Sequence, residues 1–357
     1  MTHWTRQREG GVVLALVLVL ALMLSVSMVG FARRAVMDTM IVRNRDDASR
    51  AAALARGGVW LAKAILMEDR LAKNLAGFER SEVRQTTPGN TQDDLWNQLG
   101  ALSLVDADGG RLRLAIHDTA SLLNLNAVVP YTGDESPVDA DAEEYLMEVF
   151  TKIIDEMPID PGEKLYEPRE LARNLIDYMD ADDIRLSGGR EDEYYLGQDP
   201  PHAPPNHPLL SVDELGLVEG FDVQLVEAIR PYVTVYPLVK GNGINLNTAP
   251  PHILTLLYSG VSGQRRLVSE DTVARILRLR AEGRTVCTGS DPALDCATLS
   301  EVDLGEGSLF PPSELPDDSD SFSIEIRATA GQIERTLVAV IDRSDLTQPR
   351  LLFWRMQ

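Results

Sequence analysis

Basic residues, histidines and cysteines are scarce in this chain of 357 residues. Lys and Arg number 34 against 55 Asp and Glu, which gives a formal net charge of −21 at pH 7. This acidic excess repels nucleic-acid backbones and therefore argues against nucleic-acid binding. The 5 histidines show no HExxH or comparable zinc-enzyme spacing. A hydrophobic share of 44% is nevertheless typical of a globular protein, so we expect a folded protein of about two domains without enzymatic activity.

The longest uncharged stretch begins near the N-terminus. Residues 12–32 read VVLALVLVLALMLSVSMVGFA, which is 21 residues without charge or proline. A helix of that length, rising about 1.5 Å per residue, spans a hydrocarbon core of roughly 30 Å. The alternative is a secretory signal peptide, whose apolar region is usually about 7–15 residues long. We expect a membrane helix, although arginines on both sides leave its orientation open.

Two cysteines, Cys287 and Cys296, lie nine positions apart around a polar, turn-forming segment. Such a segment brings two thiols within bonding distance, whereas two cysteines without nearby histidines make a poor zinc site. We expect a disulfide, with two unrelated thiols as the alternative. A disulfide would place the large C-terminal part in an oxidising compartment such as a periplasm.

The hydrophobic pattern predicts an α+β fold. One helix is expected over about residues 12–75, apolar all round at first and then on one face only. Alternation predicts a strand over residues 111–116 and a hairpin of residues 322–328 and 336–342. Helices are expected between them over residues 143–154, 167–179, 211–217, 223–231, 249–258 and 270–282, with Ser211, Thr248 and Ser269 as N-caps. The expected order is a long helix on a small antiparallel sheet with a large inserted all-α domain.

Two helical segments, residues 211–233 and 245–277, resemble helix-hairpin-helix or SAM-like units. In DNA-binding proteins such hairpins present backbone amides to phosphates within a basic surround. The first segment is strongly acidic and the second is nearly balanced. A structural or protein-binding role is therefore favoured over DNA binding.

The acidic stretch of residues 177–199 is the best candidate ligand site, since calcium needs several hard oxygens from one flexible loop. Asp180, Asp182 and Glu191 fit positions 1, 3 and 12 of an EF-hand count, but Ile184 and Arg185 break it at positions 5 and 6. We expect a calcium loop of another type, with a solvated acidic loop as the alternative. Its candidate ligands are Asp180, Asp182, Asp183, Glu191 and Asp192. A second candidate precedes the expected hairpin and consists of Asp317, Asp318 and Asp320.

Four segments together resemble the type II secretion system protein K family, the largest minor pseudopilins. They are TRQREGGVVLALVLVLALML, NLIDYMDADDIRLSGGREDEYYLGQDPP, HPLLSVDELGLVEGFD and INLNTAPPHIL. The first looks like a prepilin leader, in which a short basic segment and a glycine precede the apolar helix. The resemblance implies cleavage by prepilin peptidase between Gly11 and Val12 and N-methylation of Val12. It also implies a single-pass protein of the bacterial inner membrane with a periplasmic C-terminal domain.

The resemblance further implies a division of the chain. It comprises a leader (1–11), a transmembrane helix (12–32), a pilin-like helix with the first strands (33–118), an inserted α-helical domain (119–285), and a disulfide loop with the C-terminal strands of the pilin-like domain (286–357). The inserted domain would contain two SAM-like units, at about 119–217 and 218–285.

Members of this family are minor pseudopilins at the tip of the pseudopilus, where they help to initiate its assembly for export of folded proteins across the outer membrane. The implied partners are the minor pseudopilins I, J and H, the inner-membrane assembly platform and prepilin peptidase, with no nucleic acid. The implied cofactor is calcium, as one or two ions. The alternative function is a membrane-anchored helix-hairpin-helix DNA-binding module of a competence or uptake system.

One position departs from the pattern of most pseudopilins, which carry a glutamate at mature position 5. Counted from Val12, that position is Leu16 in this chain. A carboxylate in lipid is costly unless it meets a cation. A subunit with no neighbour above it has no use for one, so Leu16 agrees with a place at the tip.

Overall fold

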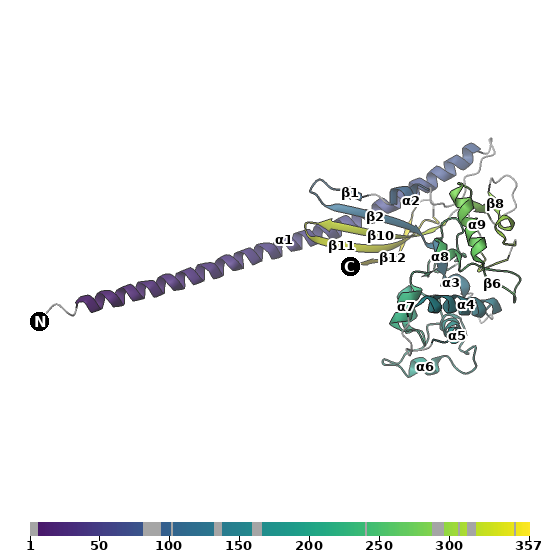
Figure 1. The fold of residues 1–357 in the computed structure, drawn as a ribbon, viewed down its shortest axis with the longest axis horizontal. Helices are drawn as coiled ribbons and strands as arrows, with labels where there is room; N and C mark the ends of the chain where they lie inside the picture. Colours follow the sequence, from purple (N-terminus) through teal and green to yellow (C-terminus); the bar gives the residue numbers. More distant parts are fainter. Residues whose placement is uncertain are drawn as a thin grey trace.

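A long helix carries a globular part that consists of a sheet and a helical unit (Figure 1). The computed structural model describes residues 6–80, 94–100, 103–131, 138–158, 166–239, 241–287, 296–305, 308–312, 319–345 and 348–357. The N-terminus lies at the far end of the long helix, whereas the C-terminus lies beside the sheet. The α+β fold class expected from the sequence is confirmed.

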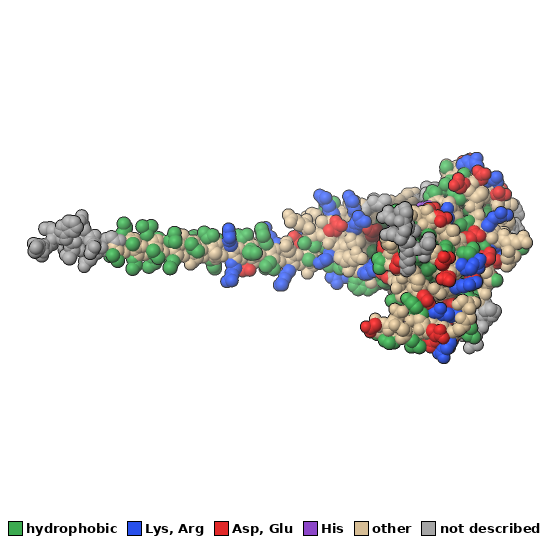
Figure 2. Space-filling model, turned by 60° about the horizontal axis from the view of Figure 1, so that its bottom comes forward, with side chains coloured by type: hydrophobic (Ala, Val, Ile, Leu, Met, Phe, Trp, Pro, Cys, Tyr) green, Lys and Arg blue, Asp and Glu red, His purple; other side chains and the backbone are tan. Residues whose placement is uncertain are grey.

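Helix α1 (Arg6–Arg80) is 75 residues long and includes the whole helix predicted over residues 12–75. Its N-terminal half stands clear of the globular part. Its large hydrophobic side chains are exposed, and Figure 2 shows them along the visible face of the helix. Water does not favour so large an exposed apolar surface. By length and composition, this helix is able to cross a membrane.

The second half of α1 packs one face on the sheet. Ala51, Ala55 and Ala62 are fully buried there, and such small side chains let a helix backbone approach the strands closely. Gly58 also lies close to the strands, since a Cβ atom added to it would be 2.9 Å from Cγ2 of Ile326. A larger residue at this position would therefore push the helix away from the sheet.

The sheet is antiparallel and has the strand order β1-β2-β10-β11-β12. Its strands are β1 (Ser103–Val105), β2 (Arg111–Asp118), β10 (Ser321–Ala330), β11 (Ile333–Asp342) and β12 (Arg350–Met356). Alternate residues of β10, such as Phe322, Ile324 and Ile326, are fully buried and face α1. The predicted strand and hairpin are thereby confirmed. β12 was not predicted, because most of its residues are exposed at the sheet edge and lack a clear alternation.

The helical unit is inserted between β2 and β10, which are neighbours in the sheet. Short α2 (Leu95–Gly100) precedes β1 and packs on α1 and β2. The helices of the unit are η1 (Thr119–Ser121), α3 (Leu125–Val128), α4 (Ala140–Glu156), α5 (Pro168–Met179), α6 (Asp192–Leu196), η2 (Val212–Leu217), α7 (Val223–Ile229), α8 (Pro251–Leu254), α9 (Glu270–Ala281) and η3 (Leu299–Val302). Its strands are β3 (Leu123–Asn124), β4 (Val233–Thr234), β5 (Tyr258–Ser259), β6 (Arg266–Leu267), β7 (Val286–Cys287), β8 (Ala297–Thr298) and β9 (Leu309–Phe310). One apolar core joins these pieces, and its centre contains the stacked rings of Tyr145 and Tyr258.

Two of the three N-cap residues predicted from the sequence are N-caps in the structure. The side chains of Ser211 and Ser269 accept hydrogen bonds at the starts of η2 and α9, as predicted. The helix predicted over residues 249–258 is wrong, since α8 ends at Leu254 and Tyr258 pairs with Phe310 in a short sheet. Thr248 is not its N-cap, because its hydroxyl donates instead to the buried carboxylate of Asp118.

A disulfide joins Cys287 and Cys296, with their Cα atoms 5.9 Å apart. Cys287 ends β7, and Cys296 directly precedes β8, which pairs with β7 in parallel. The bond therefore fastens the two short strands to each other at the edge of the helical unit.

Candidate functional site

Three carboxylates converge where α5 ends and α6 begins. Asp177 lies in the last turn of α5, Asp180 is its C-cap, and Glu191 directly precedes α6. One oxygen atom from each of them lies within 4.8 Å of the other two. The three residues form what we call the acidic cluster.

Several oxygen atoms at this cluster are buried without a hydrogen-bond partner. Glu191 is 2% exposed, and neither of its carboxylate oxygens has a partner among the described residues. Oδ1 of Asp180 and Oδ1 of Asn206 are likewise buried and unpartnered within that part of the chain. Burying a carboxylate without compensation costs several kcal/mol. A cation would remove that cost, so the residues present fit a metal ion.

The loop between α5 and α6 is held in place by backbone and side-chain hydrogen bonds. Asp177 Oδ1 accepts from the Leu186 amide at 2.9 Å, and Ile184 and Arg190 form a β-bridge across the loop. Asn206 Nδ2 donates to the Asp182 carbonyl at 2.6 Å, which brings the Asn206 side chain against the same turn. Three carboxylates are thus available at the cluster, with the Asn206 side chain held beside the same loop, and hard oxygens of this kind suit calcium.

The electrostatics of the cluster also favour a cation. Burial raises the pKa of Glu191 to about 8, and the nearby charge of Asp180 adds to the effect. Burial and the charges of Asp182 and Asp177 raise the pKa of Asp180 to about 7. Burial raises the pKa of Asp177 to about 6. A bound divalent cation would lower these pKa values, because it stabilises the ionised carboxylates that burial disfavours.

Of the five predicted ligands in this stretch, the structure brings only Asp180 and Glu191 into the cluster. Oδ1 of Asp182 accepts from the Ile184 amide at 2.7 Å, and Asp192 pairs with Arg190 at 2.6 Å. Asp183 accepts from Asn206 Nδ2 at 3.3 Å.

Asp177, a member of the cluster, was not among the predicted ligands, and neither was Asn206, which contacts the same loop. The EF-hand count began at Asp180 and therefore passed over Asp177, although the spacing of three residues places both on one face of a helix. Asn206 lies within a proline-rich segment, where the sequence carried no signal for it.

Only one residue of the second predicted calcium site lies in the part of the chain that the structure describes. Asp317 and Asp318 lie outside the described residues. Asp320 is exposed and forms an ion pair with Arg70 at 2.8 Å. The described residue of this group is thus engaged with α1.

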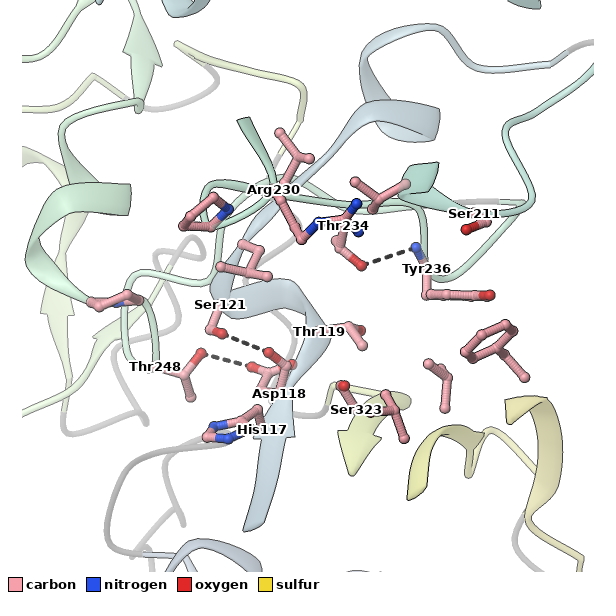
Figure 3. A pocket seen from close by; sticks show the side chains of 18 of the residues that line it. His117, Asp118, Thr119, Ser121, Ser211, Arg230, Thr234, Tyr236, Thr248 and Ser323 are labelled. Atoms are coloured by element: carbon pink, nitrogen blue, oxygen red, sulfur yellow. Dashed lines mark hydrogen bonds between the residues drawn. The ribbon is translucent and has the colours of Figure 1, made fainter. Parts of the chain in front are cut away.

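A cleft of 680 Å³ separates the sheet from the helical unit (Figure 3). His117, Ser323 and Phe353 line it from strands β2, β10 and β12. Ser211, Arg230 and Tyr236 line it from the helical unit. Asp213 bridges the two sides, since it pairs with Arg230 at 2.7 Å and with Arg355 of β12 at 2.8 Å.

The carboxylate of Asp118 lies at the base of this cleft and points toward Thr248 (Figure 3). It accepts hydrogen bonds from Thr248 Oγ1 at 2.7 Å, from Asn245 Nδ2 at 3.0 Å and from the Ala120 amide at 2.9 Å. Burial raises its pKa. Because these donors come from the first residues of the inserted unit and from its middle, Asp118 fastens two separate segments of the unit to the end of β2.

Residues 121–238 match the family model described as "Type II secretion system (T2SS), protein K". This range begins just after β2 and includes the acidic cluster. The chain is 31% identical to type II secretion system protein K of Klebsiella pneumoniae over 186 residues, which are 52% of this chain and 53% of that protein. It is 32% identical to the Aeromonas hydrophila protein of the same name over 154 residues, or 43% of this chain and 45% of that one.

The chain resembles type II secretion system protein K. The resemblance given by the sequence motifs is thereby confirmed, and the chain spans about half the length of the curated relatives it matches. Its fold is also similar to a chain of the crystal structure of the GspK-GspI-GspJ complex from enterotoxigenic Escherichia coli, with a TM-score of 0.59 and 19% identity. That match covers 88% of this chain and 99% of the other, so the fold is shared along nearly its whole length.

Proposed function

We propose that this chain is a minor pseudopilin of the type II secretion system, located at the pseudopilus tip and helping to initiate pseudopilus assembly. Its role would be the export of folded proteins across the outer membrane, without an enzymatic step of its own. The observation that carries the proposal is the helical unit, whose residues 121–238 match protein K and which interrupts a pilin-like sheet. The comparisons lend no support to the alternative of a DNA-binding module.

The architecture supports a place at the tip. The apolar half of α1 would cross the inner membrane once, and the disulfide favours a periplasmic location for the globular part. The helical unit projects sideways from the sheet (Figure 1). Such a bulky unit hinders repeated stacking in a thin filament but is tolerated in a subunit with nothing above it.

The proposed partners follow from the related complex, whose title names GspK, GspI and GspJ. We assign to this chain the corresponding minor pseudopilins I and J, together with H, the inner-membrane assembly platform and prepilin peptidase. The exposed apolar stretch of α1 provides a surface for helix bundling within the membrane.

Calcium is the proposed cofactor. One ion at the acidic cluster would be held by Asp177, Asp180 and Glu191, with Asn206 Oδ1 as a further oxygen ligand. Its contribution is charge neutralisation, which lets the loop between α5 and α6 close without buried like charges. A second ion at Asp317, Asp318 and Asp320 remains a proposal from the sequence.

The function is tested by expressing the full-length chain with prepilin peptidase and with the I and J pseudopilins of its own secretion system. The chain is expected to co-purify with I and J from membranes, with N-methylated Val12 as its first residue by mass spectrometry. An N-terminus at Met1 despite active peptidase, or cleavage beyond residue 32, would argue against prepilin processing. Absence of I and J from the purified chain would argue against the tip complex.

Leu16→Glu is expected to lower both exoprotein secretion and recovery of the tip complex severalfold. The reason is that a carboxylate placed within the membrane span costs about 2.5–3.5 kcal/mol when it has no cationic partner. Secretion assays and co-purification from membranes measure the effect, and Leu16→Ala is the matched control. Unchanged secretion in Leu16→Glu would remove the argument that a tip subunit has no use for this carboxylate.

A further inference from the structure

The first part of α1 beyond the apolar span has a charge opposite to that of the whole chain. Residues 33–56 contain six arginines and three aspartates, a net charge of +3 in a chain of −21. Figure 2 shows Lys and Arg side chains along the helix between its apolar half and the globular part. Residues 33–56 of α1 therefore form a basic surface on an acidic protein.

Three of these arginines fall on one face of the helix. Arg34, Arg45 and Arg56 are spaced eleven positions apart. Eleven residues are close to three helical turns, so the side chains lie nearly in line, about 16 Å apart.

Arg45 and Arg56 both line an open groove of 570 Å³ between α1 and residues of β11 and β12. The groove is lined by Arg45, Ala48, Ser49, Ala52 and Arg56 of α1, Arg335 of β11, Met356 of β12, and Gln357. None of these described lining residues has an acidic side chain. We call it the arginine groove.

None of the three groove arginines forms an ion pair within the described part of the chain. Neither Arg45 nor Arg335 forms an ion pair there, and Nε of Arg56 donates only to the Ala52 carbonyl of its own helix, at 3.2 Å. Arg50 is different, since it points to the β1–β2 turn and pairs with Asp108 at 3.2 Å. Arg50, which faces the β1–β2 turn, therefore has an ion pair, whereas the arginines of the groove have none among the described residues.

We propose that the arginine groove docks an acidic α-helix of a neighbouring pseudopilin, an inference that rests on the proposed function. The small side chains of Ala48, Ser49 and Ala52 leave room for a second helix to approach α1 closely. Arg45 and Arg56 would then meet carboxylates about three turns apart on that helix, and arginine binds carboxylates through paired hydrogen bonds. Arg335 would hold the helix from the sheet side.

The height of the groove favours a protein over a membrane surface. Arg45 lies 13 residues beyond the apolar span, which is about 20 Å along the helix. The headgroup layer on each side of a bilayer is only about 5–8 Å thick. An upright α1 therefore carries the groove past the lipid phosphates.

The experiment uses the full-length chain co-expressed with the I and J pseudopilins of its own system and reconstituted in neutral or anionic nanodiscs. The double variant Arg45→Glu/Arg56→Glu and the single variant Arg335→Glu are compared with Arg275→Glu, an exposed arginine of α9 far from the groove. The double variant is expected to lower recovery of the partners about tenfold in both lipids, because two ion pairs become repulsions. Arg275→Glu is expected to leave recovery unchanged, and Arg45→Lys/Arg56→Lys to retain most of it.

Each result has a separate meaning. Equal thermal unfolding temperatures for wild type and variants establish that the variants fold. Restoration of binding by an Asp→Arg or Glu→Arg change on a partner helix identifies the acidic counterpart.

Full recovery with the groove variants overturns the inference and leaves the proposed function intact. An effect confined to anionic nanodiscs assigns the groove to lipid and also overturns it. Failure of the wild-type chain to recover I or J removes both the proposed function and this inference.

Discussion

Calcium is expected to raise the Tm of the full-length chain, and Glu191→Gln is expected to abolish that rise. Glu191 is the most buried member of the acidic cluster, and its two oxygens have no other partner in the described chain. A ligand that binds only the folded state at one hundred times its Kd stabilises it by about 2.7 kcal/mol. For a protein of this size, that corresponds to a rise of about 4 °C, measurable by scanning calorimetry in mild detergent with calcium or with chelator.

The calcium-free state provides a second readout for the same variant. In chelator, Glu191→Gln is expected to be at least as stable as the wild type, because a neutral amide replaces a buried charge beside Asp180 and Asp177. Asp192→Asn is the matched control, since Asp192 is adjacent in sequence but pairs with Arg190 outside the cluster. An equal calcium effect in Glu191→Gln and wild type, or an equal loss in Asp192→Asn, would exclude the proposed ligand set.

The parts of the fold that were predicted correctly depend on local pattern. The uninterrupted apolar and amphipathic sequence of α1 and the alternation in β10 and β11 are properties of consecutive residues. β12 was missed because its mostly exposed residues lack a clear alternation. The short strand at Tyr258 was missed because its partner, Phe310, is distant in sequence. That pairing depends on the inserted unit being folded, which no local window contains.

The same distinction applies to the candidate site. The density of acidic residues located the loop, and the structure then selected among them by direction and burial. Asp182 and Asp192 have local partners in the Ile184 amide and Arg190, so their side chains are already engaged. Asp177 contributes because α5 turns its side chain toward Asp180 and Glu191. Composition thus indicates where a candidate site lies, while the direction of each side chain on its helix or loop decides which residues belong to it.

Arg343→Met is expected to destabilise the full-length chain by about 3–5 kcal/mol, the cost of removing one partner of a buried ion pair. Arg343 is fully buried and Asp69 is 3% exposed. Nη1 of Arg343 donates to Asp69 Oδ2 at 2.9 Å and to the Leu66 carbonyl at 3.1 Å, while its guanidinium lies 4.5 Å from the centre of the Phe322 ring. One side chain therefore fastens α1 to the strands it covers.

Urea unfolding in mild detergent, followed by tryptophan fluorescence, measures this loss. Arg350→Met is the matched control, because Arg350 pairs with Asp342 at 2.8 Å but its side chain is 66% exposed. An exposed pair contributes about 1 kcal/mol or less. The double variant Asp69→Leu/Arg343→Met is expected to regain much of the stability, since both charges are removed together and apolar side chains occupy their place. If Arg343→Met costs no more than Arg350→Met, the buried pair is not what holds α1 on the sheet, and the packing of Ala55, Gly58 and Ala62 alone must account for it.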